Sequence, residues 1–149
     1  MQTLNPLLSD WKDRFQLPPF DLIKDHHFDE AFDEAFLQLE KAINKISEQS
    51  DAPSFSNTIE ALERSDRLME KVAGVFANLA SSNSNPALEA LQRELAPKWA
   101  KVDSDIKLNR KLFIRIDTLH KNRMNLSLSS EQMRVLELYH LSFFRSGQK

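Results

Sequence analysis

Five segments of the chain place large apolar residues three and four positions apart, and this spacing constrains the fold more than any other feature. An α-helix turns once in about 3.6 residues, so the spacing gathers apolar side chains on one helix face. The segments cover residues 25–49, 57–79, 85–106, 111–123 and 129–146. None of them alternates apolar and polar residues as a half-buried strand would. We therefore predict an all-α fold of about five helices.

Capping residues indicate where two of these helices begin. Asn57 with Glu60, and Ser129 with Gln132, have the spacing of a capping box, in which each side chain accepts a hydrogen bond from the other residue's backbone N–H. Gly147 occupies the position just past the fifth helix where glycine is favoured. The sequence thus predicts helix starts at Asn57 and Ser129 and a helix end before Gly147.

Short connectors join the helical segments. They cover residues 50–56, 81–84 and 125–128. Links of this length favour antiparallel neighbours, so we expect an antiparallel helical bundle or a set of helical hairpins. Pro97 lies inside the third segment and is predicted to kink it, because proline removes one backbone hydrogen bond.

Residues 1–24 differ from the rest of the chain. Pro6, Pro18 and Pro19 interrupt a run rich in large apolar residues. Proline disfavours a regular helix and pushes the preceding residue towards extended backbone. We expect an extended N-terminal arm over residues 1–24, packed on another part of the protein, and a helical domain over residues 25–149.

Composition excludes several classes of function. The chain has two glycines, too few for a phosphate-cradling loop, and no cysteine for a disulfide, zinc finger or thiol nucleophile. Twenty Lys and Arg against 22 Asp and Glu give a net charge of −2, so we expect no nucleic-acid partner. No apolar run approaches the roughly 18 residues of a membrane span, and no signal-peptide pattern is present. We expect a cytoplasmic protein with no membrane partner.

Four histidines are the strongest candidates for metal binding or proton transfer: His26, His27, His120 and His140. The chain lacks the H-E-x-x-H motif, in which two histidines one turn apart bind zinc from the same helix face. His26 and His27 are adjacent, and adjacent side chains on a helix diverge by about 100°. A surface or arm-packing role is therefore expected for this pair.

A carboxylate also lies three residues before His120 and before His140, at Asp117 and Glu137. This is the ligand spacing of di-metal helical bundles, which need further carboxylates from two other helices. The available residues are Glu34, Glu40, Glu60, Glu63 and Glu94, mostly off the apolar stripes. A carboxylate–histidine di-metal bundle is thus a remote alternative, and His140 is expected to be a hydrogen-bonded residue at the edge of a core.

The serines offer no nucleophile, since no G-x-S-x-G motif is present and most serines lie in connectors, where they cap helices and form turns. We accordingly expect no catalytic, cofactor-binding or metal-binding residue in this chain.

Seven motifs nonetheless occur in an order that resembles a known family. They are NPLL at 5–8, LPPFDLIKDHHFDEAFDEAF at 17–36, FSNTIEALERS at 55–65, VFANL at 75–79, NPALEALQRELAP at 85–97, IKLNRKLFIRID at 106–117 and RVLELYHLSFFRSGQK at 134–149. In these motifs the chain resembles the N-terminal region of the thimet-oligopeptidase family of zinc metallopeptidases. The likeness is closest to the bacterial peptidyl-dipeptidases, then to oligopeptidase A.

The resemblance implies a parent enzyme several times longer than 149 residues, with its zinc ligands in the part that follows. Its matched region would be a non-catalytic helical wall beside a channel that admits short oligopeptides and excludes folded proteins. The partners would be the remainder of the peptidase and, for the parent, short oligopeptides. This chain alone is expected to be inactive, as a truncated or natural fragment. Its apolar faces are expected either to be exposed or to mediate self-association.

A second reading from the residues stays open. Amphipathic helices without catalytic groups are also typical of a self-standing protein-interaction module, which binds a partner helix or peptide through its apolar faces.

Overall fold

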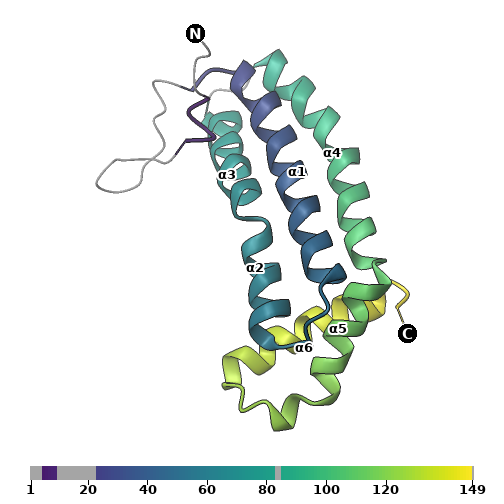
Figure 1. Ribbon diagram of the computed structural model, residues 1–149. Helices are drawn as coiled ribbons and strands as arrows, with labels where there is room; N and C mark the ends of the chain where they lie inside the picture. Colours follow the sequence, from purple (N-terminus) through teal and green to yellow (C-terminus); the bar gives the residue numbers. More distant parts are fainter. Residues whose placement is uncertain (1–4, 10–22, 83–84, 149) are drawn as a thin grey trace. The chain divides into compact units, whose positions relative to one another are not determined.

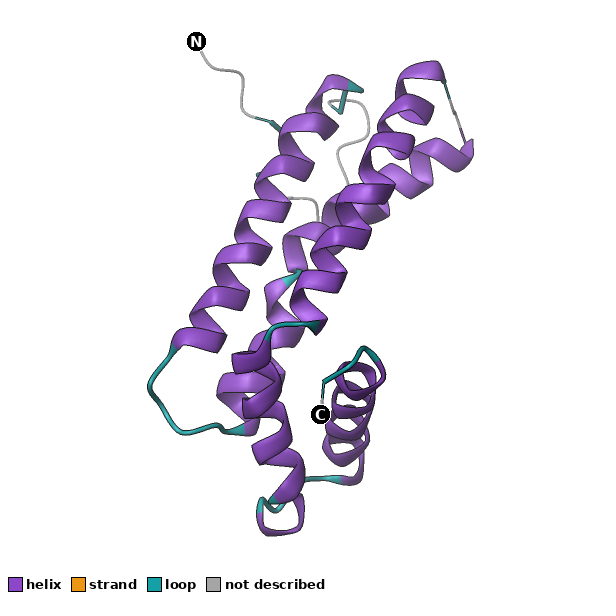
Figure 2. Cartoon of the chain, turned by 90° about the vertical axis from the view of Figure 1, so that its right-hand side faces the viewer, coloured by secondary structure: helices purple, strands orange, loops and turns teal. Residues whose placement is uncertain are grey.

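A computed structural model describes residues 5–9, 23–82 and 85–148 of the chain (Figure 1). All regular structure within these residues is helical, as Figure 2 shows. The helices are α1 (His26–Glu48), the π-helical turn η1 (Phe55–Glu60), α2 (Ala61–Ser65), α3 (Arg67–Ser82), α4 (Pro86–Lys107), α5 (Arg110–Lys121), the 3₁₀ turn η2 (Arg123–Asn125) and α6 (Ser130–Arg145). The predicted all-α fold is confirmed.

The last helix begins and ends where the sequence predicts. The Ser129 hydroxyl accepts a hydrogen bond from the Gln132 backbone N–H at 3.1 Å, and the Gln132 side chain accepts one from the Ser129 N–H at 2.9 Å. Past the helix, Gly147 has a φ of +107°, a conformation that costs glycine little because it has no Cβ. The capping box and the C-terminal glycine are both confirmed.

The predicted second helix is wrong in two respects. Its cap is Ser54 rather than Asn57, and Asn57 supplies the returning side chain of that capping box. The segment is also divided, because α2 ends at Ser65 and α3 begins at Arg67. Both Ser54 and Asn57 have a short polar side chain able to cap. The Asn57 side-chain oxygen accepts from the Ser54 N–H and also from Arg115 on α5, a distant contact that local sequence does not reveal.

The chain folds into two compact units. The first combines Met1–Glu40 with Asp66–Ala96, and the second combines Lys41–Ser65 with Pro97–Lys149. Helices α1 and α4 each contribute residues to both units. Helix α4 is helical on both sides of Pro97.

Aromatic and aliphatic side chains from α1, α3 and α4 form the core of the first unit. In this unit α3 runs antiparallel to α1, and α4 antiparallel to α3 (Figure 1). Phe28 and Phe32 on α1 contact Phe76 on α3 edge to face, with ring centroids 5.3 and 5.6 Å apart. Edge-to-face geometry places the positive ring edge against the negative face of the next ring. This cluster holds the two helices together.

The described residues before α1 also belong to this core. Residues 5–9 form a turn, and the Leu7 side chain is fully buried among the α1 and α3 residues. The Asn5 side chain donates to the His27 carbonyl at 2.8 Å, and its oxygen accepts from the Leu7 N–H at 3.0 Å. The rest of the expected arm, residues 1–4 and 10–22, lies outside the described residues.

The second unit has its own apolar core. Its most buried side chains are Ile43, Ile46, Ile59, Leu62, Leu112, Phe113, Ile116, Leu119, Leu136 and Phe143. Helices α5 and α6 form a hairpin in which the rings of Phe113 and Phe143 stack with centroids 6.5 Å apart. No helix of the described residues is sufficiently long and apolar to cross a membrane.

Replacement of Phe28 by Ala should destabilise the protein by about 3–5 kcal/mol, because it removes a fully buried ring and leaves a cavity. Urea unfolding followed by circular dichroism measures the change. The control is Met124→Ala in η2, where the side chain is 81% exposed and a loss of no more than about 0.5 kcal/mol is expected. Equal losses for the two variants would contradict the assigned core.

Candidate functional site

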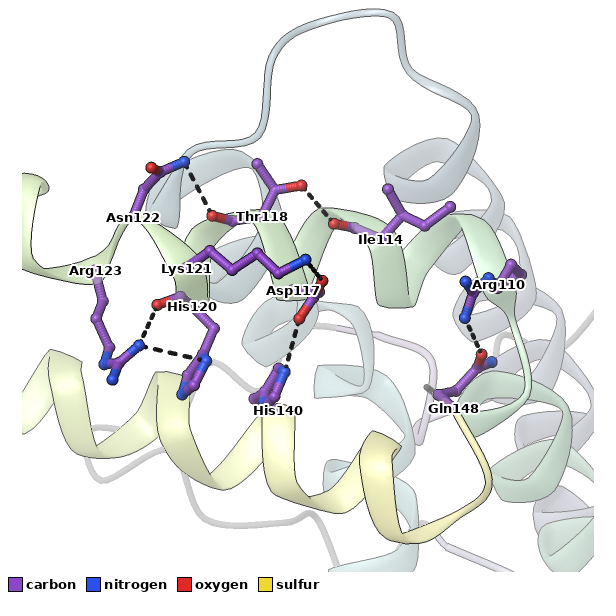
Figure 3. A network of polar contacts seen from close by, with 10 residues as sticks. All are labelled: Arg110, Ile114, Asp117, Thr118, His120, Lys121, Asn122, Arg123, His140 and Gln148. Atoms are coloured by element: carbon purple, nitrogen blue, oxygen red, sulfur yellow. Dashed lines mark hydrogen bonds and ion pairs between the residues drawn. The ribbon is translucent and has the colours of Figure 1, made fainter.

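Three side chains singled out from the sequence meet between α5 and α6 in the second unit (Figure 3). Asp117 and His120 lie one turn apart on α5, and His140 faces both of them from α6. The two carboxylate–histidine motifs are thus brought together. The carboxylate of the first motif pairs with the histidine of the second, rather than with the histidine of its own helix.

Asp117 receives hydrogen bonds from both helices. Its Oδ1 lies 3.0 Å from His140 Nε2, and its Oδ2 lies 2.9 Å from Lys121 Nζ. An ionised carboxylate only accepts hydrogen bonds, so His140 must carry a proton on Nε2. Asp117 therefore fixes the orientation and the tautomer of His140. The sequence-based expectation that His140 is a hydrogen-bonded residue agrees with this geometry.

The His120 ring lies flat against the His140 ring. Their centroids are 3.9 Å apart and the ring planes differ by 3°. Arg123 Nη1 lies 3.5 Å from His120 Nδ1 and donates to the His120 carbonyl at 2.6 Å. Because a guanidinium only donates, it favours His120 with an unprotonated Nδ1.

The surroundings shift two pKa values in this cluster. Burial lowers the pKa of His120, and the neighbouring His140 and Arg123 lower it further, against the opposing charges of Glu137 and Asp117. Burial alone would raise the pKa of Asp117, but the hydrogen bonds and charges of Lys121 and His140 together lower it below its ordinary value. The cluster therefore favours an ionised carboxylate beside a neutral His120.

This arrangement supports a structural role. A carboxylate-oriented histidine can serve as a general base, but only where a substrate can approach it. The open pocket found in this unit has a volume of about 420 Å³ and is formed by α1, the following loop, η1 and α2, without Asp117, His120 or His140. The cluster joins α5 to α6.

A buried guanidinium is the residue that sequence reasoning missed. Arg115 on α5 is only 7% exposed, and its three nitrogens donate to Thr58 Oγ1 at 3.3 Å, to the Asp51 carbonyl at 2.8 Å and to Asn57 Oδ1 at 3.0 Å. Burial lowers its pKa, against the opposing charge of Asp51. Its position three residues after Leu112 places it on the apolar face of α5, and that spacing was the available signal.

The other candidates lie apart from this cluster. His27 on α1 accepts a hydrogen bond from the Lys24 N–H at 2.9 Å, and its ring centroid is 4.2 Å from that of His26. Burial, and then the charge of His26, lower the pKa of His27. Over the described residues no three His, Asp or Glu side chains are placed to share a metal ion, so nothing there favours the di-metal alternative.

The proposed bundle carboxylates make other contacts. Glu34 accepts from Gln38, Glu60 lies 3.9 Å from Arg64, and Glu63 accepts from the Tyr139 hydroxyl. These contacts lie at the protein surface and fit the ordinary role of charged residues on exposed helix faces.

Comparison with known proteins gives three similar sequences. The chain is 36% identical over 149 residues to the dipeptidyl carboxypeptidase of Escherichia coli strain K12. It is 36% identical over 143 residues to the dipeptidyl carboxypeptidase of Salmonella typhimurium strain LT2, and 26% identical over 133 residues to the probable cytosolic oligopeptidase A of Arabidopsis thaliana. These similarities confirm the resemblance expected from the seven motifs.

The matches cover 100%, 96% and 89% of this chain but 22%, 21% and 18% of the relatives. The chain thus spans about a fifth of the length of the curated relatives that it matches. No protein-family model matches the chain.

Arg115→Lys should lower the free energy of unfolding by about 1–3 kcal/mol, because one ammonium group cannot reach all three acceptors and leaves buried oxygens without a donor. Chemical unfolding measures the difference. Arg145→Lys, at an exposed position at the end of α6, is the matched control and should change stability by less than about 0.5 kcal/mol. An unchanged free energy of unfolding in the Arg115→Lys variant would show that the three hydrogen bonds contribute nothing to stability.

The lowered pKa of His120 predicts a loss of stability in mild acid. The unfolded chain binds a proton at this residue near pH 6.5, whereas the folded chain binds it only at lower pH. The contribution of His120 is therefore fully present above pH 6.5 and falls as the pH decreases through and below that value.

Thermal unfolding between pH 8 and pH 5 tests this linkage. The His120→Gln variant should lose less stability than the wild type over this range. The slope of stability against pH that remains in this variant should include the part due to His27, whose pKa is also lowered. A His27→Gln control should keep the part due to His120. Identical slopes for wild type and His120→Gln would refute the linkage.

Proposed function

We propose that this chain, as a homologue of one segment of the dipeptidyl carboxypeptidases, is a non-catalytic helical segment of a zinc peptidyl-dipeptidase. It forms part of the wall that limits the enzyme's channel to short oligopeptides, and it works in the cytoplasm. The observation that carries the proposal is the 36% identity that extends over all 149 residues.

The chemistry of the chain supports a non-catalytic role. The sequence has no H-E-x-x-H motif, and its Asp117–His140 pair joins helix α5 to helix α6. Zinc and its ligands would belong to the remainder of the peptidase. The helical cores support a wall role, because close-packed interiors resist deformation and hold a surface in place.

One exposed face of α6 supports the proposal that the remainder of the peptidase binds to this chain. Leu138, Leu141 and Phe144 lie three residues apart on α6 and are 55%, 41% and 53% exposed. The opposite side of the same helix buries Leu136 and Phe143. A helix that is apolar on two sides normally has two neighbours. We refer to Leu138, Leu141 and Phe144 as the α6 apolar face.

The same face supports the alternative of a self-standing interaction module. Apolar side chains grouped on an exposed helix are typical of surfaces that bind a partner helix or a second copy of the chain. The two functions differ in what the face contacts, so they can be separated by experiment.

A chimeric enzyme tests the wall proposal. The matched segment of the Escherichia coli dipeptidyl carboxypeptidase is replaced by this chain, and release of C-terminal dipeptides from a short peptide is measured. The chimera should be active, and Leu138→Gln with Leu141→Gln should lower its activity by about tenfold, as expected when central interface residues become polar.

The control in this experiment is Met124→Gln, at an apolar side chain that is 81% exposed and lies outside α6. It should leave the chimera unchanged. Full activity of the bacterial enzyme after deletion of the segment would refute a wall function. An inactive chimera, together with a concentration-dependent dimer of the isolated chain that the two Leu→Gln changes abolish, would instead favour the interaction module.

A further inference from the structure

The pocket of the second unit has no role in the function proposed above. It is formed by the end of α1, the loop after it, η1 and α2, and its volume of about 420 Å³ lies within the range of small-molecule sites in proteins, roughly 300–1,000 Å³. Its lining combines apolar side chains with a few charged ones, a composition that small-molecule sites share.

Charge in the lining favours a singly charged anion. Lys45 and Arg64 contribute two positive charges and Asp51 one negative charge, so two minus one leaves a net charge of +1. Arg64 is only weakly paired, since its Nη1 lies 3.9 Å from Glu60 Oε2 and both side chains are about half exposed. An exposed pair of this kind contributes little stability and can yield to a better-placed anion.

A buried cation behind the pocket adds to this preference. Arg115 donates to the carbonyl of Asp51 and to the side chain of Asn57, and both residues line the pocket. All three of its hydrogen-bond acceptors are neutral oxygens, and the opposing charge that acts on it is that of Asp51. Buried charges are normally balanced by opposite charges, so an anion in the pocket would add to the effect of Asp51.

The remaining lining selects for an apolar part of the ligand. Ala42 and Ile46 on α1 and Ala61 on α2 contribute apolar surface. The Gln49 side-chain NH₂ group donates to the carbonyls of Ile46 and Asn57. Both of its N–H donors are therefore used within the protein, and its amide oxygen is left as an acceptor. A small multiply charged anion such as phosphate would leave the apolar surface unused.

We propose that this pocket binds a small monocarboxylate with an apolar arm, with the carboxylate held by Lys45 and Arg64 and the arm packed on Ala42, Ile46 and Ala61. Binding in the pocket requires no peptidase activity and no other part of a larger enzyme. The site is therefore independent of the wall function, and either proposal can fail alone.

Nuclear magnetic resonance titration of the ¹⁵N-labelled chain tests the site with N-acetylleucine, which has one carboxylate and an isobutyl arm. Its neutral amide, N-acetylleucinamide, is the matched ligand control. The acid should shift the backbone amides of Ile46 and Ala61 in a saturable way, and the amide should bind at least about tenfold more weakly, because it lacks the charge. Inorganic phosphate at the same concentration should not compete.

Variants complete the test. Lys45→Gln and Arg64→Gln should each raise the Kd for N-acetylleucine by about fivefold to tenfold, as expected for the loss of one charge-assisted contact. Lys41→Gln, one turn earlier on α1 and outside the pocket lining, makes the same change in net charge and should leave the Kd unchanged. The proposal fails if no saturable binding is found, if acid and amide bind equally, if phosphate competes equally, or if all three variants bind alike.

Discussion

A buried guanidinium needs hydrogen-bond acceptors around it, and this requirement shapes the second unit. Each of the three Arg115 nitrogens donates to one acceptor, and these are a hydroxyl, a backbone carbonyl and a side-chain amide oxygen from residues 51–58. Those acceptors must stand at fixed positions, so the loop after α1 and the start of η1 are held against α5. Two of the residues that supply these acceptors, Asp51 and Asn57, also line the pocket. A single charge therefore determines the course of the loop and the local electrostatics.

The sequence predicts the parts of the fold that depend on local spacing. The all-α class, the capping box at Ser129 and the glycine after α6 follow from residues within one or two turns of each other. The cap at Ser54 was missed because Asn57 carries the same local signal. The Asn57 side-chain oxygen also accepts a hydrogen bond from Arg115, 58 residues away, and local patterns contain no information about such a distant contact.

The candidate site likewise has features that local sequence predicts and features that depend on distant contacts. The two carboxylate–histidine motifs are visible in the sequence, and so is the core-edge position of His140. The pairing of Asp117 with His140 depends on how α5 and α6 pack, because a shift of α6 by one residue would rotate His140 away by about 100°. Helix periodicity fixes which face of a helix is buried but leaves the register between two helices open.

The Asn5 side chain gives the turn at residues 5–9 an influence on the core of the first unit. Its amide links the turn at residues 5–9 to the first turn of α1, and this link holds Leu7 in the core. A change at Asn5 would therefore act on the core of the first unit through the position of Leu7, although the Asn5 side chain adds no apolar surface to that core.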